Sequence, residues 1–203
     1  MIFRHFRVPP PAASFVFALT AILLGPVRAE EANAPVTLSK VAFHFEVPFE
    51  KQTGSRQCGL AAANMVCGYY GQPLSKTQQK WLVSVSKAGA GITGAEMMVS
   101  FRTADYESAV FAGTLDHEKT GIYYHLDHKR PLIVMITSKD KQSSHYDVLN
   151  GYDPKKGYLL LLDPASGPMT ISEKDFAPAW KRANNFTLLA IPQKIAAQET
   201  PTH

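Results

Sequence analysis

The sequence predicts an α+β domain in which helices come first and an antiparallel sheet follows. Two helix-capping patterns and an alanine-rich run lie before residue 104, whereas short apolar or alternating runs separated by turn residues dominate after residue 130. Helices and strands segregated in this way are typical of α+β folds. With 203 residues, 45% of them hydrophobic, the chain is long enough to bury the core of one such domain.

The N-terminal segment 1–29 has the three-part pattern of a secretory signal peptide. Two arginines precede an apolar run at 12–24, and small residues lead up to Ala29. We therefore predict cleavage near Ala29, a linker at 30–40, and an exported protein that is periplasmic or secreted. The apolar run is shorter than the ~20 residues of a membrane-spanning helix, so we expect no integral membrane segment in the mature chain. Retention of the segment as an anchor is the alternative.

The positive charge of the chain comes largely from this N-terminal segment. The formal net charge is +4, from 21 basic and 17 acidic residues, and the segment holds three arginines and no acidic residue. The remaining 18 basic and 17 acidic residues give +1. A nearly neutral mature chain gives no electrostatic support for binding nucleic acid, so we expect no nucleic-acid partner.

The predicted domain spans 41–193 and begins with a strand at 41–47. A helix at 58–70 follows, because apolar side chains recur there at nearly helical spacing. Gly71 and Pro73 are expected to stop this helix.

Capping boxes predict two further helices. Each pairs a hydroxyl residue with Gln or Glu three positions later, at Ser75–Gln78 and at Thr93–Glu96, with a glycine-rich connector at 87–92 between them. The pattern at 106–112 predicts a strand, and that at 115–129 predicts a helix.

Four strands of one antiparallel sheet are predicted in the second half of the chain. A hairpin turn at Asp153–Gly157 joins two of them. A short helix is expected at 172–180, and residues 194–203 are expected to form a polar tail. The predicted strands are 131–137, 145–152, 157–163 and 186–192.

Cys58 stands at the predicted start of the first helix. A thiol there has its ionised form stabilised by the helix dipole and by unpaired backbone N–H groups, which makes it a candidate nucleophile. Gln52, six residues earlier, offers a neutral amide donor for an oxyanion hole. The alternative for Cys58 is a disulfide with Cys67. Geometry opposes it, because nine residues of one helix separate two side chains by about 13 Å along the axis, whereas a bridge needs Cα atoms within about 7 Å.

A base for this thiol has to be a histidine, because imidazole both accepts and returns a proton near pH 7. Of the seven histidines, His145 opens a predicted strand directly after a polar loop. A side chain in that place is held rigidly and remains accessible. Three other histidines fall in or beside a predicted amphipathic helix and are interpreted as a solvated face: His117, His125 and His128.

A carboxylate is expected to orient the imidazole and to stabilise its charged form. Asp163 ends the strand that follows the hairpin, so antiparallel pairing brings it next to His145. Asp147, two residues along the strand of His145 and on the same face, is the competing candidate. We prefer Asp163 for this role.

These residues resemble those of the papain-like peptidases related to the domain that cleaves double-glycine leaders from bacteriocin precursors. The resemblance covers most of residues 44–192. It rests on Gln52 with Cys58-Gly59, the helix end Gly68-Tyr-Tyr-Gly71, the strand from His145 to Gly151-Tyr152-Asp153, and the run from Gly157-Tyr158 to Asp163-Pro164.

The resemblance implies a papain-like fold in which the N-terminal helices, the nucleophile helix among them, pack on a C-terminal antiparallel sheet. It also implies that Cys58 is the nucleophile, His145 the base, Asp163 the orienting group and Gln52 an oxyanion donor. Relatives usually carry an acidic residue just before the cysteine, where this chain has Gln57. Leader-cleaving members are fused to membrane transporters and act on the cytoplasmic side, whereas this chain has a predicted signal peptide and no predicted spanning helix. We therefore expect the catalytic chemistry to carry over to this chain, but not cleavage at double glycine.

The sequence thus predicts an exported cysteine peptidase that hydrolyses peptide bonds through a Cys-His-Asp triad without a cofactor or a metal. His125 and His128 form the only short histidine pair, and no third ligand accompanies them. The expected partner is a peptide or protein substrate, and a single dedicated exported substrate is one option. Another acyl transfer on the same fold, deamidation or transpeptidation, and an inactive binding protein are the alternatives. The cleavage site and the oligomeric state stay open.

Overall fold

The computed structural model describes residues 39–40, 42–140 and 143–199. The predicted signal segment 1–29 and its cleavage site lie outside the described residues. Within the described ranges, none of the helices is both long enough and apolar enough to cross a membrane.

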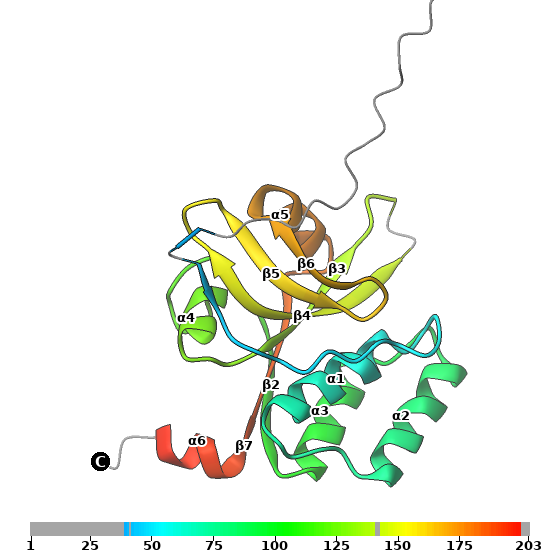
Figure 1. Ribbon diagram of the computed structural model, residues 1–203. Helices are drawn as coiled ribbons and strands as arrows, with labels where there is room; N and C mark the ends of the chain where they lie inside the picture. Colours follow the sequence, from blue (N-terminus) through cyan, green and yellow to red (C-terminus); the bar gives the residue numbers. More distant parts are fainter. Residues whose placement is uncertain (1–38, 41, 141–142, 200–203) are drawn as a thin grey trace, which may run out of the picture. The chain divides into compact units, whose positions relative to one another are not determined.

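One antiparallel sheet organises the domain. Six of its strands follow the order β2-β7-β3-β4-β5-β6, and the short β1 pairs with β4 from off this path. Figure 1 shows β3 to β6 curving in the upper part, while β2 and β7 run down beside the helices. The strands are β1 Phe43–His44, β2 Tyr106–Ala112, β3 Leu132–Thr137, β4 Ser144–Asp153, β5 Tyr158–Asp163, β6 Gly167–Ser172 and β7 Phe186–Pro192.

The helices pack against this sheet in separate places. In Figure 1, α1, α2 and α3 lie together below the curved strands; α1 contacts β4 and β3, and α3 contacts β2. Helix α5 packs on β3 and β6, and α4 packs on β4. The helices are α1 Cys58–Tyr69, α2 Lys76–Ala88, α3 Gly94–Thr103, α4 Ile122–Asp127, α5 Glu173–Arg182 and α6 Gln193–Glu199.

The predicted capping residues begin three of these helices. Both capping boxes form, with Ser75 accepting from the Gln78 N–H at the start of α2 and Thr93 accepting from the Glu96 N–H at the start of α3. Ser172 caps α5 in the same way. Each bond satisfies a backbone donor that the first helical turn leaves unpaired.

Helix α1 is buried between the sheet and the other two helices of its group. Its apolar side chains join the residues of β3, β4 and β5 in one continuous core. Fully or almost fully buried members from these elements include Ala62, Ala63, Met65, Val66, Ile133, Val134, Val148, Leu149 and Leu159. Removing these side chains from water fixes the start of α1 against the strands.

The predicted helix at 115–129 is wrong over its first half. The Asp116 side chain accepts hydrogen bonds from the Thr114 hydroxyl and the Glu118 N–H, which stabilises a turn in place of a helix. Gly121 lies against the Asp116 carbonyl, where a Cβ would be only 2.1 Å away. Only α4 remains of the expected helix.

Three further differences concern strand and tail. The strand predicted at 41–47 pairs only at Phe43–His44. Edge strand β6 was not predicted, because Gly167 and Pro168 at its start look like loop residues. Part of the predicted polar tail folds as α6, which packs on β7 and β2.

A β-bulge at Asn150 sets the register between β4 and β5. On one side Gly151 pairs with Leu160, and on the other Leu149 pairs with Leu161, so one residue of β4 is skipped. The backbone near β1 holds this bulge, because Phe45 N–H donates to the Asn150 carbonyl and the Asn150 amide donates to the Phe45 carbonyl, both at 3.1 Å. Continued towards the end of β5, the shifted register brings Asp163 opposite Asp147.

Candidate active site

Cys58 is the first residue of α1, and no side chain caps that helix. The preceding Gln57 side chain accepts a hydrogen bond from the Thr53 hydroxyl. The backbone donors of the first turn therefore stay available at the thiol. This arrangement contrasts with α2, α3 and α5, whose first turns are satisfied by Ser75, Thr93 and Ser172.

The environment of Cys58 favours its ionised form. Burial of the thiol opposes ionisation, but hydrogen bonds with the His145 side chain and with the backbone of Tyr146 and Gly59 outweigh it, so the pKa of Cys58 is lowered. Cys67 behaves in the opposite way, because burial raises its pKa to about 11. Both cysteines are free thiols, and only Cys58 is partly exposed. The thiol predicted to be reactive is therefore the one with the lowered pKa.

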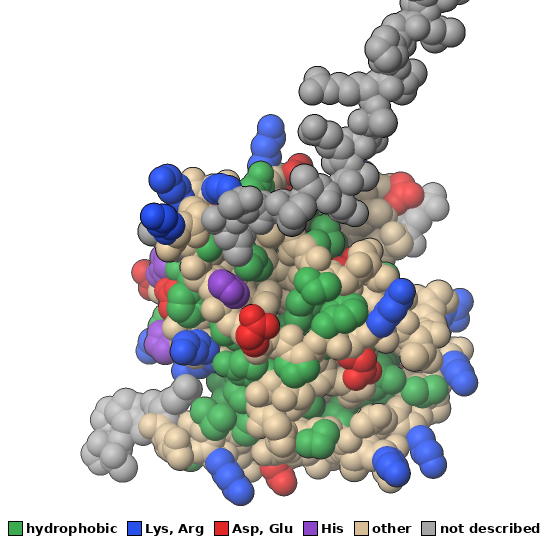
Figure 2. All heavy atoms as spheres, in the orientation of Figure 1, with side chains coloured by type: hydrophobic (Ala, Val, Ile, Leu, Met, Phe, Trp, Pro, Cys, Tyr) green, Lys and Arg blue, Asp and Glu red, His purple; other side chains and the backbone are tan. Residues whose placement is uncertain are grey.

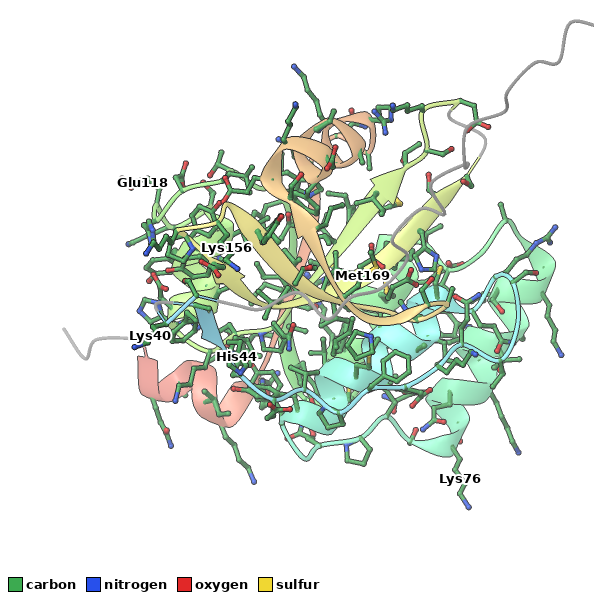
Figure 3. The ribbon with its side chains drawn as sticks, turned by 45° about the horizontal axis from the view of Figure 1, so that its top comes forward. Lys40, His44, Lys76, Glu118, Lys156 and Met169 are labelled. Carbon is green, nitrogen blue, oxygen red and sulfur yellow. The ribbon has the colours of Figure 1, made fainter. Side chains whose placement is uncertain are left out.

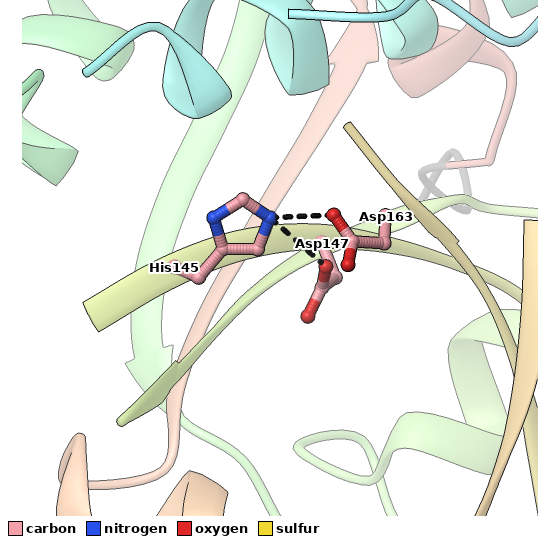
Figure 4. Close-up of side chains that lie close together, drawn as sticks. All are labelled: His145, Asp147 and Asp163. Atoms are coloured by element: carbon pink, nitrogen blue, oxygen red, sulfur yellow. Dashed lines mark hydrogen bonds and ion pairs between the residues drawn. The ribbon is translucent and has the colours of Figure 1, made fainter. Parts of the chain in front are cut away.

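His145 lies on β4 between the thiol and two carboxylates. Its Nε2–H donates to Asp163 Oδ1 at 2.7 Å, and the other ring nitrogen, Nδ1, points away from both carboxylates (Figure 4). Burial lowers the pKa of His145, but the hydrogen bond with Cys58, the charge of Asp147 and the hydrogen bond with Asp163 raise it, to about 9. The imidazole is therefore charged at neutral pH.

Asp163 ends β5 in a turn that satisfies its carboxylate. Its Oδ1 accepts from the Ala165 N–H at 2.7 Å in addition to His145. Burial raises the pKa of Asp163, yet the bonds from Ala165, His145 and Ser166 overcome this and the pKa is lowered. Asp163 is thus an ionised acceptor at the imidazole, in the position predicted for the orienting group.

Asp147 reaches the same imidazole without a hydrogen bond. Its Oδ1 lies 3.6 Å from His145 Nε2, beyond hydrogen-bonding distance, and neither of its buried oxygens has a hydrogen-bond partner among the residues that the structure describes. The side chain is 1% exposed. Burial raises the pKa of Asp147 to about 7, although the charge of His145 acts in the opposite direction. Of the two competing carboxylates, Asp163 forms the bond that orients the ring.

Gln52 lies on the loop before α1 and is tied to the turn after β5. Its backbone N–H donates to the Pro164 carbonyl at 2.9 Å, and its side-chain Nε2 donates to the Gly54 carbonyl at 3.0 Å. Its Oε1 is buried without a hydrogen-bond partner. Because a primary amide has two N–H groups, one remains for an oxyanion after the bond to Gly54.

Of the three histidines that were interpreted as a solvated face, His117 and His128 are exposed as predicted and His125 is not. His125 is buried, at 5% exposure, so its interpretation as a solvent-facing residue is wrong. It packs against Phe111 and Tyr124. His117 is exposed and pairs with Asp127 at 2.8 Å.

Three side chains at the site bring donor atoms close together. One donor atom each from His145, Asp147 and Asp163 lies within 4.8 Å of the others. The His145 ring already donates a hydrogen bond to Asp163 and forms a second hydrogen bond with the Cys58 thiol. We therefore interpret the group as a hydrogen-bonded imidazole and its carboxylates, and not as a metal centre.

Sequence reasoning missed the backbone groups that complete the site. The Tyr146 backbone acts on the thiol and the Ala165 N–H acts on Asp163. Gly59 also has a steric role, because a Cβ there would lie 3.1 Å from Ile92 and 3.4 Å from the Tyr146 ring. Backbone groups of this kind carry no sequence signal apart from the glycine.

Exposed apolar side chains lie on the segments that flank the site. Phe49, on the loop leading to Cys58, is 41% exposed, and Met169, on edge strand β6, is 44% exposed. Figure 3 shows Met169 on the part of the sheet nearer α1, with Lys156 and Lys40 at the far end. On the face drawn in Figure 2, Lys and Arg lie mostly at the margin and uncharged or apolar atoms fill most of the middle.

Comparison with protein families gives one match that spans most of the domain. The model of the Peptidase_C39 like family matches residues 44–187, a range that includes Gln52, Cys58, His145 and Asp163. No curated protein matches the chain.

Several solved structures share the fold. The peptidase domain of Streptococcus ComA, a bi-functional ABC transporter involved in quorum sensing, is 21% identical, with 73% of this chain and 100% of that chain covered and a TM-score of 0.57. A double glycine motif protease from an AMS/PCAT transporter, in complex with the leader peptide, is 21% identical over 74% of this chain and 94% of that chain, with a TM-score of 0.54. A C39-like peptidase from Bacillus anthracis is 15% identical over 74% and 97%, with a TM-score of 0.55. The predicted papain-like α+β fold is confirmed.

Proposed function

The chain belongs to the Peptidase_C39 like family and is thus a cysteine peptidase, and from this premise we propose that Cys58, His145 and Asp163 form its catalytic triad. Gln52 is proposed as the side-chain donor of the oxyanion hole. The reaction is hydrolysis of a peptide bond by way of a thioester.

The hydrogen bonds of His145 with Asp163 and with Cys58 are the observations that support this proposal. Asp163 accepts the hydrogen bond from Nε2–H at 2.7 Å, which leaves Nδ1 as the ring nitrogen for the hydrogen bond with the Cys58 thiol. The lowered pKa of Cys58, produced against burial by the His145 hydrogen bond, and the pKa of about 9 at His145 together favour a thiolate beside an imidazolium. That ion pair is the reactive form of a cysteine nucleophile.

Acylation begins when the Cys58 thiolate attacks the carbonyl carbon of the scissile bond. The electron pair of the C=O moves to oxygen, and backbone N–H of Cys58 with the free amide N–H of Gln52 stabilises this oxyanion. His145 gives its Nδ1 proton to the leaving amine as the C–N bond breaks. The acyl group is then held as a thioester on Cys58.

Deacylation uses the same groups in the reverse direction. Neutral His145 removes a proton from a water molecule, the hydroxide attacks the thioester, and the thiolate leaves. The Asp163 carboxylate stabilises the imidazolium that forms in each half-reaction and keeps the ring in the required tautomer. The chain returns to its starting ion pair.

The substrate is proposed to be a peptide or protein met outside the cytoplasm. The N-terminal pattern at 1–29 supports export, and a structural relative has been solved with a leader peptide. A single dedicated exported substrate is compatible with these features.

Thiol alkylation across pH tests the triad directly. We expect iodoacetamide to label Cys58 with an apparent pKa well below the 8.5 of a free thiol, and we expect His145→Ala to remove this advantage. Cys67→Ala is the matched control, since Cys67 is buried and its pKa is raised to about 11, so its loss leaves the labelling curve unchanged. Labelling of Cys58 at the rate of an ordinary thiol would contradict the proposal.

Product analysis then identifies the acceptor of the acyl group. The mature protein is incubated with a library of unlabelled peptides, and cleavage products are identified by mass spectrometry, with Cys58→Ala as the blank. New N-termini that need Cys58 support hydrolysis. Ammonia release or coupling of two peptides, without new N-termini, would assign the site to another acyl transfer.

A further inference from the structure

Beside the proposed triad lies a buried ionisable group that the mechanism does not use, the carboxyl of Asp147. We propose that Asp147 is a positioning residue that acts on His145 by charge alone, keeping the imidazole protonated and so setting the alkaline limit of the reaction. This inference rests on the proposed function for its meaning, because the imidazolium matters only as the partner of the Cys58 thiolate.

The geometry separates Asp147 from an ordinary structural carboxylate. It lies two residues from His145 on β4, so both side chains project from the same face of the strand. Its Oδ1 is 3.6 Å from His145 Nε2, and both oxygens lack a hydrogen-bond partner. A buried polar group without a partner is costly, and a charge 3.6 Å away in a poorly solvated place acts strongly on the ring.

Few ionisable groups face Asp147 from the elements around it. On its own strand it faces His145, and from β5 it faces Asp163, whose charge opposes its ionisation. On the other neighbour, β3, the residue paired with it is Val134, which is apolar. Helix α1 contributes Cys58, which acts on the same imidazole from the thiol side. Asp147 therefore interacts with one cation and one anion among the described residues.

The two carboxylates at His145 have different environments. Asp163 accepts from Ala165 and Ser166 as well as His145, and these bonds lower its pKa and favour its ionised form. Asp147 has no such donors, and burial raises its pKa to about 7. Carboxylates whose pKa values are pushed apart in this way take different roles. Asp163 orients the ring through a hydrogen bond, whereas Asp147 contributes charge once the pH rises above neutral.

The sign of the effect follows from the order of the pKa values. Below about pH 7 Asp147 is protonated and neutral, and His145 is already charged. Above that pH Asp147 carries a negative charge, which is among the causes that hold the pKa of His145 near 9. Without Asp147 the imidazole loses its proton at a lower pH, and the thiolate loses its charged partner with it.

The test compares Asp147→Asn and Asp147→Val with the wild-type mature protein. The His145 ring is followed by NMR as a function of pH, and Cys58 alkylation and peptide hydrolysis are measured over the same range. An opposite charge within about 4–6 Å is worth 1–3 pKa units, so we expect both variants to move the His145 titration and the alkaline limb of the rate down by about one unit. The ratio of the hydrolysis rates at pH 9 and pH 6 then falls about fivefold, because an imidazole with a pKa of about 9 is half protonated at pH 9 and one with a pKa lower by one unit is about one-tenth protonated.

Asp153→Asn is the matched control, because it neutralises another buried carboxylate of the same strand at the end away from His145. It is expected to leave the His145 titration in place. The valine variant also guards against misfolding, since it puts an apolar side chain next to Val134 and removes the unpaired polar atoms. Both variants titrating like the wild type, or both lowering the rate equally at every pH, would overturn the proposal.

The NMR titration needs no substrate, so it separates this inference from the proposed function. A His145 shift in the two variants without any peptide cleavage by the wild type would contradict the proposed function and support the role of Asp147. Peptide cleavage by the wild type, with a His145 titration that the two variants do not move, would support the proposed function and contradict the role of Asp147.

Discussion

Strand β4 carries a buried aspartate near each end, and the two are treated in opposite ways. Asp153 is fully buried and accepts from the Ser39 N–H and hydroxyl at 2.7 Å each, and from the Lys155 and Lys156 N–H groups at 3.2 Å. Asp147 is 1% exposed and accepts no hydrogen bond from the described part of the chain. The same strand therefore carries one buried carboxylate that is fully hydrogen-bonded and one that is not hydrogen-bonded within the described residues.

The difference separates a structural end of the strand from a reactive end. Asp153 closes the β4–β5 turn and anchors the segment before β1, and its pKa is lowered because the bonds from Ser39 and the turn outweigh its burial. Around Asp147 the donors are missing and an imidazole lies beside it. Unsatisfied buried groups lower stability, so their presence indicates a role other than stability.

The largest effect is expected at the reactive end, from His145→Ala. Loss of the general acid and base should lower kcat/KM for a cleaved peptide by about 10³-fold or more. The change also removes the cation beside Asp147 and Asp163, so the melting temperature is expected to fall as well, and activity is compared at a temperature where the variant is folded. Steady-state hydrolysis and circular dichroism measure the two. An activity within tenfold of the wild type would contradict the assignment of the His145 end of β4 to catalysis.

Asp163→Ala should have the next largest effect. The imidazole loses the acceptor that fixes its tautomer, and we expect kcat to fall on the order of 10²-fold. Asp163→Asn is the matched variant, because its amide oxygen still accepts from His145 Nε2–H. Recovery of most of the activity in the asparagine variant would sharpen the assignment of Asp163 to orientation. Equal loss in both would indicate that its charge is essential.

Asp147→Val is expected to be more stable than the wild type above pH 7, by about 1–4 kcal/mol, because each unit by which folding raises a carboxyl pKa costs about 1.4 kcal/mol once the group is ionised. The pKa of Asp147 is about 7 in the folded state, whereas an aspartate in the unfolded chain has a pKa of 3.8, so the folded state binds the extra proton. Stability is therefore lost as pH rises from 3.8 through about 7, and the variant should lack this loss. Urea denaturation at pH 4 and pH 8 measures the difference. A gain of equal size at both values would contradict the raised pKa.

Asp153→Asn should act in the opposite direction on stability. It keeps the shape of the side chain but weakens the bonds from Ser39 and the turn, so the melting temperature should drop by a few degrees. Because the native pKa is lowered, the difference should shrink as acid protonates the wild-type carboxylate. Thermal melts at neutral and acidic pH provide the comparison. A variant as stable as the wild type would show that the hydrogen bonds of Asp153 do not stabilise the fold.

Asn150→Ala is expected to have the smallest effect. It removes the side-chain bond to Phe45 and should cost about 1 kcal/mol, while the backbone bond from Phe45 to the bulge remains. A modest fall in activity should accompany it, because the bulge sets where Asp163 stands relative to His145. Hydrolysis and urea denaturation of the same sample give both numbers. A loss of activity much larger than the loss of stability predicts would show that the bulge positions Asp163 for catalysis.

Much of the fold could be predicted because its signals are local. The caps at Ser75 and Thr93 need only four residues each, and strand β2 was predicted with its bounds at Tyr106 and Ala112. The failures come from tertiary context or from turn chemistry. Asp116 replaces two helical turns by a loop, and β6 begins with residues that do not look like a strand.

The site divides in the same way. Cys58 and His145 could be found from their places at element boundaries, and Asp163 from the hairpin pairing. The bulge at Asn150 could not be found, although it decides which residue of β4 faces Asp163. The state of Asp147 was equally hidden, because the absence of donors depends on what β3, β5 and α1 bring to its surroundings.

The hydrogen bond from Gln52 to Pro164 bears on when the chain becomes reactive during folding. The helix of Cys58 can form from neighbouring residues, but its partners arrive from strands far along the sequence, and such long-range closures come late. Until β4 packs beside the start of α1, the thiol has no imidazole beside it, and until β5 pairs with β4 that imidazole has no Asp163. A chain in which α1 has formed alone therefore carries an ordinary cysteine, and the Gln52 loop is fixed only once the turn after Asp163 is in place.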